Sequence, residues 1–378
     1  MSSSKDTREA DEVSPVETKK GRGPLSRGAA LMIAAAFVFS ALSGIFTALS
    51  LNAILIFVVA GAALALLAAL VGQATEQLGS YMGSGATGVL QSAFGNLPEL
   101  FVGIFALRAG LIGVVQAALV GSILGNSLFV LGLAFFFGGL RHGTQRFGSG
   151  APRRISNLTL LAVAALAVPT LVYGLHTPAA AHEDGLSIAS AAILLIVFIT
   201  SIPFSLEGGA TRLPDGPQEL QKEAVAWPLW LIIVVLVGAG VGSAFVSDWF
   251  VNALTPAITF LHISQAFTGL VIVALAGNAV ENVVGVQFAI RNQSDFAISV
   301  ILNSSLQVAL GLIPFLVILS FFIGGAHLTL VMPPLLVAAL GLTAILSTVI
   351  VYDGESNWLE GLTLIGLYGI IAISFWWG

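Results

Sequence analysis

The chain has 378 residues, of which 57% are hydrophobic and only 9% are charged, and its mean hydropathy is +0.99. Soluble domains carry about 25% charged residues, so this composition excludes a water-soluble globule and indicates a surface that mostly faces lipid. The lack of cysteine excludes disulfides, thiol catalysis and thiolate metal sites, and the small net charge of −5 gives no basis for nucleic-acid binding.

The N-terminal segment 1–27 is the only part with a soluble-like composition, because it carries charges of both signs and shows no apolar periodicity. It is predicted to be a disordered cytoplasmic tail. The apolar block behind it is too long for a signal peptide and is expected to remain as a membrane anchor.

Eleven apolar stretches follow the tail, each close to the roughly 20 residues that a spanning helix needs. The sequence therefore predicts an all-α polytopic membrane protein with 11 transmembrane helices. The turn at Ser50 is the weakest boundary, since one span over 28–71 would reverse the topology of everything that follows. The predicted spans are 28–49, 51–71, 86–107, 112–138, 155–174, 186–206, 227–246, 266–290, 296–322, 328–350 and 357–377.

The basic residues support this count. With the N-terminus in the cytoplasm, 13 of the 14 Lys and Arg residues fall on the cytoplasmic side, and only Arg108 falls outside. The predicted setting is an integral membrane position, in a bacterial cell membrane, with the lipid bilayer as the main environment.

The two halves of the chain share one motif. The string GNLPELFVG at 95–103 recurs as GNAVENVVG at 277–285, an offset of 182 residues that also pairs Ser122 with Ser304. On the predicted topology the two copies run in opposite directions. Spans 2–6 (50–206) and 7–11 (227–378) are thus predicted to be inverted five-helix repeats, with 28–49 as an extra helix and 207–226 as a cytoplasmic linker. Inverted repeats that meet at a midplane site are a recurring design of secondary transporters.

Glu99 and Glu281, at the centre of this motif, are the only two of the 19 acidic residues that lie deep within predicted spans. A carboxylate near the bilayer centre costs roughly 2.5–3.5 kcal/mol on insertion scales, which favours a functional role for a pair at equivalent positions. The structural alternative is a protonated acid that bonds a neighbouring helix. Asn96 and Asn278 precede the two acids by three residues, so each predicted helix presents an amide and a carboxyl on one face.

The flanking residues add close approach and free carbonyl groups. Gly95 and Gly277 allow another helix to come near and expose backbone oxygen, although helix packing alone would also explain them. Pro98 is expected to free the carbonyl of Phe94 in a continuous helix. Such an all-oxygen set suits a hard cation such as Ca²⁺. Two facing carboxylates at low dielectric need either a cation or protons between them, so a cation and protons are expected to compete for the same oxygens.

These residues resemble the Ca²⁺/H⁺ exchanger (CAX) family of the calcium/cation antiporter superfamily. The resemblance rests on GNLPEL with GSILGN at 121–126 and on GNAVEN with NSSLQ at 303–307, and it covers roughly residues 50–378. It implies a ten-helix core with one extra helix, and it implies that Glu99 and Glu281 bind Ca²⁺ and carry protons. The further residues that it implies are Asn96, Asn278, Asn126 and Gln307, with Ser122, Ser304 and Ser305 as weaker candidates.

Two departures from the family pattern matter. Asn282 stands where the family commonly has His, which puts a proton relay at that position in doubt. The segment 207–226 is less acidic than the family's linker, which puts calcium regulation through it in doubt.

The leading hypothesis is therefore a secondary antiporter, not an enzyme, that exchanges a divalent cation, Ca²⁺ in the first place, for protons without a cofactor. Na⁺ or K⁺/H⁺ exchange at the same site is the alternative, and Mn²⁺ as cargo and a homo-oligomer are left open. A cation channel and an intramembrane hydrolase are the candidates from other classes. A hydrolase would need a nucleophile and a base within reach, and the spans offer no Ser-His or Asp-Asp arrangement.

Overall fold

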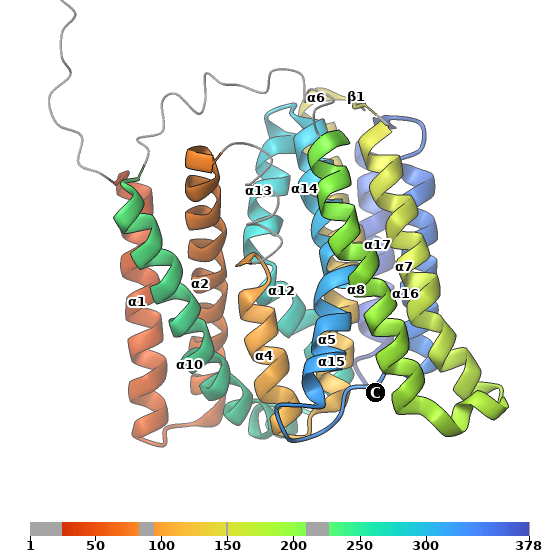
Figure 1. The fold of residues 1–378 in the computed structure, drawn as a ribbon. Helices are drawn as coiled ribbons and strands as arrows, with labels where there is room; N and C mark the ends of the chain where they lie inside the picture. Colours follow the sequence, from red (N-terminus) through yellow and green to blue (C-terminus); the bar gives the residue numbers. More distant parts are fainter. Residues whose placement is uncertain (1–24, 83–93, 149, 209–226, 378) are drawn as a thin grey trace, which may run out of the picture.

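The computed structural model of the chain describes residues 25–82, 94–148, 150–208 and 227–377 (Figure 1). The first 24 residues of the predicted tail, the first part of the third predicted span at 86–93 and most of the predicted linker at 209–226 lie outside the described residues. Within those residues the fold is a bundle of helices, with one two-residue ribbon at the upper edge in Figure 1.

The first half of the bundle begins with two long helices, and its later helices are shorter or contain a π-helical or 3₁₀ segment. Ser26 starts the first helix by accepting a hydrogen bond from the backbone N–H of Ala29 at 3.2 Å. The elements are α1 (Arg27–Ala48), α2 (Ala53–Met82), α4 (Leu97–Arg108), α5 (Ile112–Leu124), π-helix η1 (Gly125–Val130), α6 (Leu131–His142), β1 (Gln145–Arg146), α7 (Gly150–Gly174), 3₁₀-helix η2 (Pro178–His182) and α8 (Glu183–Gly208).

The second half starts with the longest described helix and ends on a helix that Asn357 and Glu360 cap as a capping box. Strand β2 pairs antiparallel with β1, so the ribbon joins the two halves of the chain. The elements are α10 (Leu229–Leu261), α11 (Gln265–Phe267), π-helix η3 (Thr268–Val273), α12 (Ala274–Gly277), α13 (Ala279–Ile290), α14 (Ser294–Gln307), π-helix η4 (Val308–Leu312), α15 (Ile313–Ser320), α16 (Pro334–Ile350), β2 (Glu355–Ser356) and α17 (Trp358–Ser374).

Every one of the eleven predicted spans contains a helix. Among the described residues, seven helices are long and apolar enough to cross a membrane, or eight if the bent pair 265–277 and 281–290 counts as one span. Two more apolar helices, α16 and α17, have 17 residues each. The all-helical membrane fold is thus confirmed, and the count of eleven spans stays a prediction.

Two predicted spans end too early. The second was placed at 51–71 and the seventh at 227–246, but α2 continues to Met82 and α10 to Leu261. The two helices pack against each other along their length, and this packing keeps their more polar ends helical where composition alone suggested a loop. Glu76 therefore lies inside α2, six residues before the end of the helix.

Elements in the two halves recur at the same 182-residue offset that the motif shows. Helix α4 and helix α13 each have 12 residues and begin 182 residues apart. The same offset relates the start of α5 to that of α14, and the end of η1 to that of η4. In Figure 1, α4 occupies the lower half of the bundle and α13 the upper half, so the two helices extend from mid-depth toward opposite faces.

Candidate cation site

Both copies of the motif form a helix break followed by a short helix. Asn96 and Asn278 adopt nearly the same backbone conformation, with φ/ψ of −99°/21° and −90°/25°, and each caps the helix that follows. The segments before and after Asn278 differ in direction by 64°. Glu99 and Glu281 are the third residues of α4 and α13, so each carboxyl lies at the positive end of a helix dipole.

This geometry corrects two sequence-based expectations. The acids were placed near the middle of continuous helices, whereas they lie in the first turn of short helices that start at mid-depth. Pro98 was expected to interrupt a helix and free the carbonyl of Phe94, but it is the second residue of α4. The missing N–H of a proline is not needed in a first turn, so Pro98 favours the start of the helix.

The two acids are buried and belong to one electrostatic unit. Each side chain is 8% exposed, and the carboxyl group of Glu281 is near enough to act on Glu99 by a Coulomb interaction. Glu99 also contacts the second copy of the motif directly. A Cβ atom built on Gly277 would lie 2.8 Å from both Cδ and Oε1 of Glu99, so only glycine fits there. The oxygen Oε2 of Glu99 is buried and has no hydrogen-bond partner.

A buried amide and hydroxyl network surrounds Asn278. Its Nδ2 donates to Oγ of Ser122 and to the carbonyl of Ala274, each at 2.9 Å, while its Oδ1 accepts from Nδ2 of Asn126 at 3.1 Å. Nδ2 of Asn126 also donates to Oγ of Ser304 at 2.9 Å, and Oδ1 of Asn126 is buried without a partner. Residues from α5, η1, α14 and the break at Asn278 therefore meet in one polar cluster.

The other predicted site residues lie around this cluster. Asn96 is 9% exposed, and its side chain makes no capping hydrogen bond. Ser305 is buried, and its Oγ lies 2.9 Å from Oγ of Ser127. Gln307 is buried at the end of α14, and Gly95 is half-buried just before the first break.

A small cavity adjoins Glu99. Its volume of about 20 Å³ is enough for roughly one water molecule. Apart from Glu99 and Ser122, its walls are apolar or glycine, and they come from α4, α5 and η3. These walls are Val102, Gly103, Ala106, Val114, Val115, Ala118, Leu119 and Val273. Water or ions therefore have little room beside the carboxyl group on this side of it.

The donor set is built from oxygen. In the described part of the chain no three His, Cys, Asp or Glu side chains gather as a metal cluster, so the two carboxyls are the only charged ligands that the site offers. Carboxylate, amide, hydroxyl and carbonyl oxygens are the ligands of hard cations, and a transition-metal centre would call for His or Cys.

Comparison with known proteins follows from this geometry. The sequence profile described as "sodium/calcium exchanger protein" matches two segments, residues 52–206 and 231–377, which together make up most of the chain. The chain belongs to the sodium/calcium exchanger protein family. This is a family of transporters, so the chain is not an enzyme.

Relatives and solved structures agree with this assignment. A protein of Synechocystis sp. named Ca²⁺/H⁺ antiporter is 35% identical over 342 residues, which cover 85% of this chain and 90% of that protein. The structure described as native YfkE is 31% identical, with a TM-score of 0.78 and coverage of 91% of this chain and 99% of the other. A structure described as the H⁺/Ca²⁺ exchanger CAX shares the fold, with a TM-score of 0.72 at 16% identity and 91% coverage of both chains.

Sequence reasoning missed two parts of this exchanger's site. Ser127 joins the cluster through Ser305, but its counterpart at the 182-residue offset is Ala309, so the repeat carried no signal for it. The apolar cavity walls were also missed, because Val, Ala and Leu in an apolar helix look the same whether they face lipid or a site. Only the adjacency of Ser127 to Asn126 could have suggested it.

Proposed function

We propose that this protein is a secondary antiporter that exchanges Ca²⁺ for protons at Glu99 and Glu281. The observation that carries the proposal is the placement of two buried carboxyls in the first turns of two short helices that meet at mid-depth. Two buried negative charges without compensation are very costly, so the pair needs either a cation or protons. A divalent cation neutralises both carboxylates at once, and two protons do the same in its place.

The surrounding oxygens complete the proposed ligand set. Asn96 and Asn278 contribute amide oxygens beside the acids, and the breaks at Gly95 and Gly277 contribute backbone carbonyls. Asn126 and Gln307 are the amide groups on the neighbouring helices. The unpartnered Oε2 of Glu99 and Oδ1 of Asn126 support this role, since a bound cation would satisfy both atoms.

The proposed architecture is alternating access between inverted repeats. Residues 50–206 and 227–378 form the two five-helix units, 28–49 is an extra helix, and the N-terminus lies in the cytoplasm of a bacterial cell. The shared 182-residue offset of α4 and α13 supports the duplication, as do the two separate segments that the family profile matches. The opposite courses of α4 and α13 support the inversion (Figure 1). In this arrangement the proton gradient drives Ca²⁺ out of the cytoplasm.

Proteoliposomes test the proposal. With a pH gradient imposed, the wild-type protein is expected to drive Ca²⁺ uptake, and a protonophore is expected to stop it. Glu99→Gln and Glu281→Gln keep the size of the side chain but remove its charge, so each is expected to abolish exchange in a folded protein. Glu355→Gln, at a half-exposed surface carboxyl, is the matched control and is expected to transport normally. Normal exchange by either site variant would overturn the proposal.

Na⁺ or K⁺/H⁺ exchange at the same site is the second candidate, because the family description names sodium beside calcium. Competition separates the two candidates. Excess Na⁺ or K⁺ is expected to leave Ca²⁺ uptake nearly unchanged if Ca²⁺ is the cargo, since a monovalent ion neutralises only one of two carboxylates. Strong inhibition by either ion, with uptake of that ion, would favour the alternative.

A further inference from the structure

Helix α13 carries Glu281 at one end and is held by the other half of the chain at its far end. The break at Asn278 separates α13 from α12, so the preceding helix does not fix the direction of α13. Because α13 has only 12 residues, a small tilt at its end would move the carboxyl of Glu281. The contacts at Ile290 and beyond therefore bear on the site.

Two side chains from the segment after α6 bind the end of α13. Nε2 of Gln145 donates to the carbonyl of Ala289 at 3.0 Å and to Oδ1 of Asn292 at 3.1 Å. Nε2 of His142 lies 2.8 Å from the carbonyl oxygen of Ile290, which can only accept. The last carbonyls of a helix have no partner within it, so these contacts complete the C-terminus of α13.

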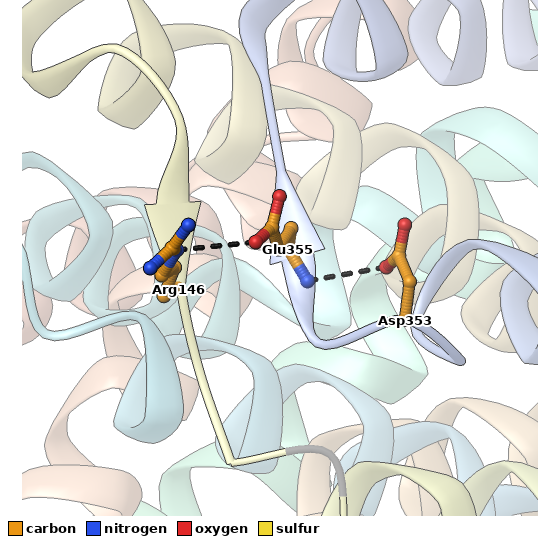
Figure 2. Close-up of polar contacts among 3 residues, drawn as sticks. All are labelled: Arg146, Asp353 and Glu355. Carbon is orange, nitrogen blue, oxygen red and sulfur yellow. Dashed lines mark hydrogen bonds and ion pairs between the residues drawn. The ribbon is translucent and has the colours of Figure 1, made fainter.

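Gln145 is fixed in a close-fitting seat. It is 2% exposed, and a Cβ atom built on Gly138 of α6 would lie 2.0 Å from its Oε1, so a larger residue at 138 would displace it. The ribbon around Gln145 is braced by the ion pair between Nε of Arg146 and Oε1 of Glu355 at 3.1 Å. The backbone N–H of Glu355 also donates to Oδ1 of Asp353 at 3.1 Å, as Figure 2 shows.

The first half of the chain contains an equivalent contact at the opposite face. The carbonyl of Leu107, 182 residues before Ala289, accepts a hydrogen bond from the backbone N–H of Ala326 at 3.1 Å. Both carbonyls also accept a local N–H three residues later, from Gly110 and Asn292, at 3.0 Å each. The two acid-bearing helices thus end alike, except that a backbone group holds α4 and a side chain holds α13.

We propose that Gln145 is a positioning residue for the exchange reaction: by holding the end of α13 it sets the place of Glu281 in the cation site. This inference rests on the proposed Ca²⁺/H⁺ exchange for its transport consequence, and on the geometry of α13 alone for its structural one. Gln145 does not touch the cation, so its loss acts on affinity and leaves the charged ligands in place.

Transport kinetics give the first test. Gln145→Met and Gln145→Glu keep the approximate size but remove both N–H donors, and each is expected to raise the KM for Ca²⁺ roughly three- to tenfold with a smaller change in kcat. Gly138→Ala is expected to have the same effect, and combining it with Gln145→Met should add little because both act on one seat. Arg146→Ala removes the exposed ion pair of the same ribbon and is the matched control, with an expected change below about twofold.

Hydrogen exchange gives a second readout that does not depend on transport. In Gln145→Met, amides of residues 279–292 are expected to exchange faster, while those of residues 97–110 keep their wild-type rate. Unchanged exchange in 279–292, or a KM no different from that of Arg146→Ala, would overturn the role of Gln145. If the wild-type protein moved no Ca²⁺, the proposed function would fall, and the exchange rates of 279–292 would still decide the inference.

Discussion

Glu99 and Glu281 occupy equivalent positions in their halves of the chain, but their surroundings differ. Glu99 lies beside a small apolar cavity and against Gly277, and its Oε2 has no partner. The Asn that precedes Glu281, Asn278, is bound into a network with Ser122, Asn126 and the carbonyl of Ala274. Asn96, which precedes Glu99, makes no capping hydrogen bond.

This difference indicates that a duplicated motif serves two tasks. The second copy joins the halves of the bundle, because its Asn binds residues of α5 and η1 and its Gly receives the carboxyl of Glu99. The first copy leaves more of its oxygens free for a ligand. A symmetric pair of acids is thus held by an asymmetric set of supports, and substitutions at equivalent positions are expected to have unequal effects.

The largest expected effect in this comparison comes from Gly277→Ala. The added Cβ would meet Cγ of Glu99 at 2.7 Å and must displace the carboxyl. Overpacking of this kind costs about 1–3 kcal/mol, which corresponds to a rise in the KM for Ca²⁺ of about 5- to 150-fold. Gly341→Ala, where an added Cβ meets nothing within 4 Å, is the control in the same proteoliposome assay. If Gly277→Ala matched this control, the close contact with Glu99 would not exist.

A smaller effect is expected on stability, and it separates the two Asn residues. Asn278→Ala leaves the buried groups of Ser122 and Asn126 short of a partner and is expected to lower the free energy of unfolding by about 1–2 kcal/mol. Asn96→Ala removes no capping bond and is expected to cost less than about 0.5 kcal/mol. Thermal unfolding of the purified variants checks this order. Equal losses would contradict the assignment of the linking task to the second copy alone.

The sequence was enough to predict the helical membrane fold and the family. Each predicted span contains a helix because about 20 apolar residues leave the backbone in lipid few alternatives. The two acids were recognisable because a repeated carboxyl in an apolar span is costly. The ends of α2 and α10 were not, since packing between the helices, and not local composition, keeps residues such as Glu76 helical.

The breaks at Asn96 and Asn278 were also missed, because apolar residues continue on both sides and the Asn-to-Glu spacing fits both a continuous helix and a helix start. The network around Asn278 and the seat of Gln145 depend on residues about 150 positions apart, which no local pattern reveals. The conformation of the motif and its supports therefore had to come from the structure.

The central claim, that Ca²⁺ and protons share the oxygens of Glu99 and Glu281, is tested most directly by measuring both fluxes in the same proteoliposomes. A Ca²⁺ indicator and a pH indicator report the two movements after Ca²⁺ is added on one side. Two shared carboxyls predict about two protons moving against each Ca²⁺, with both fluxes lost together in Glu99→Gln and in Glu281→Gln. Ca²⁺ movement without a counterflow of protons, or a proton flux that survives in either variant, would contradict the account.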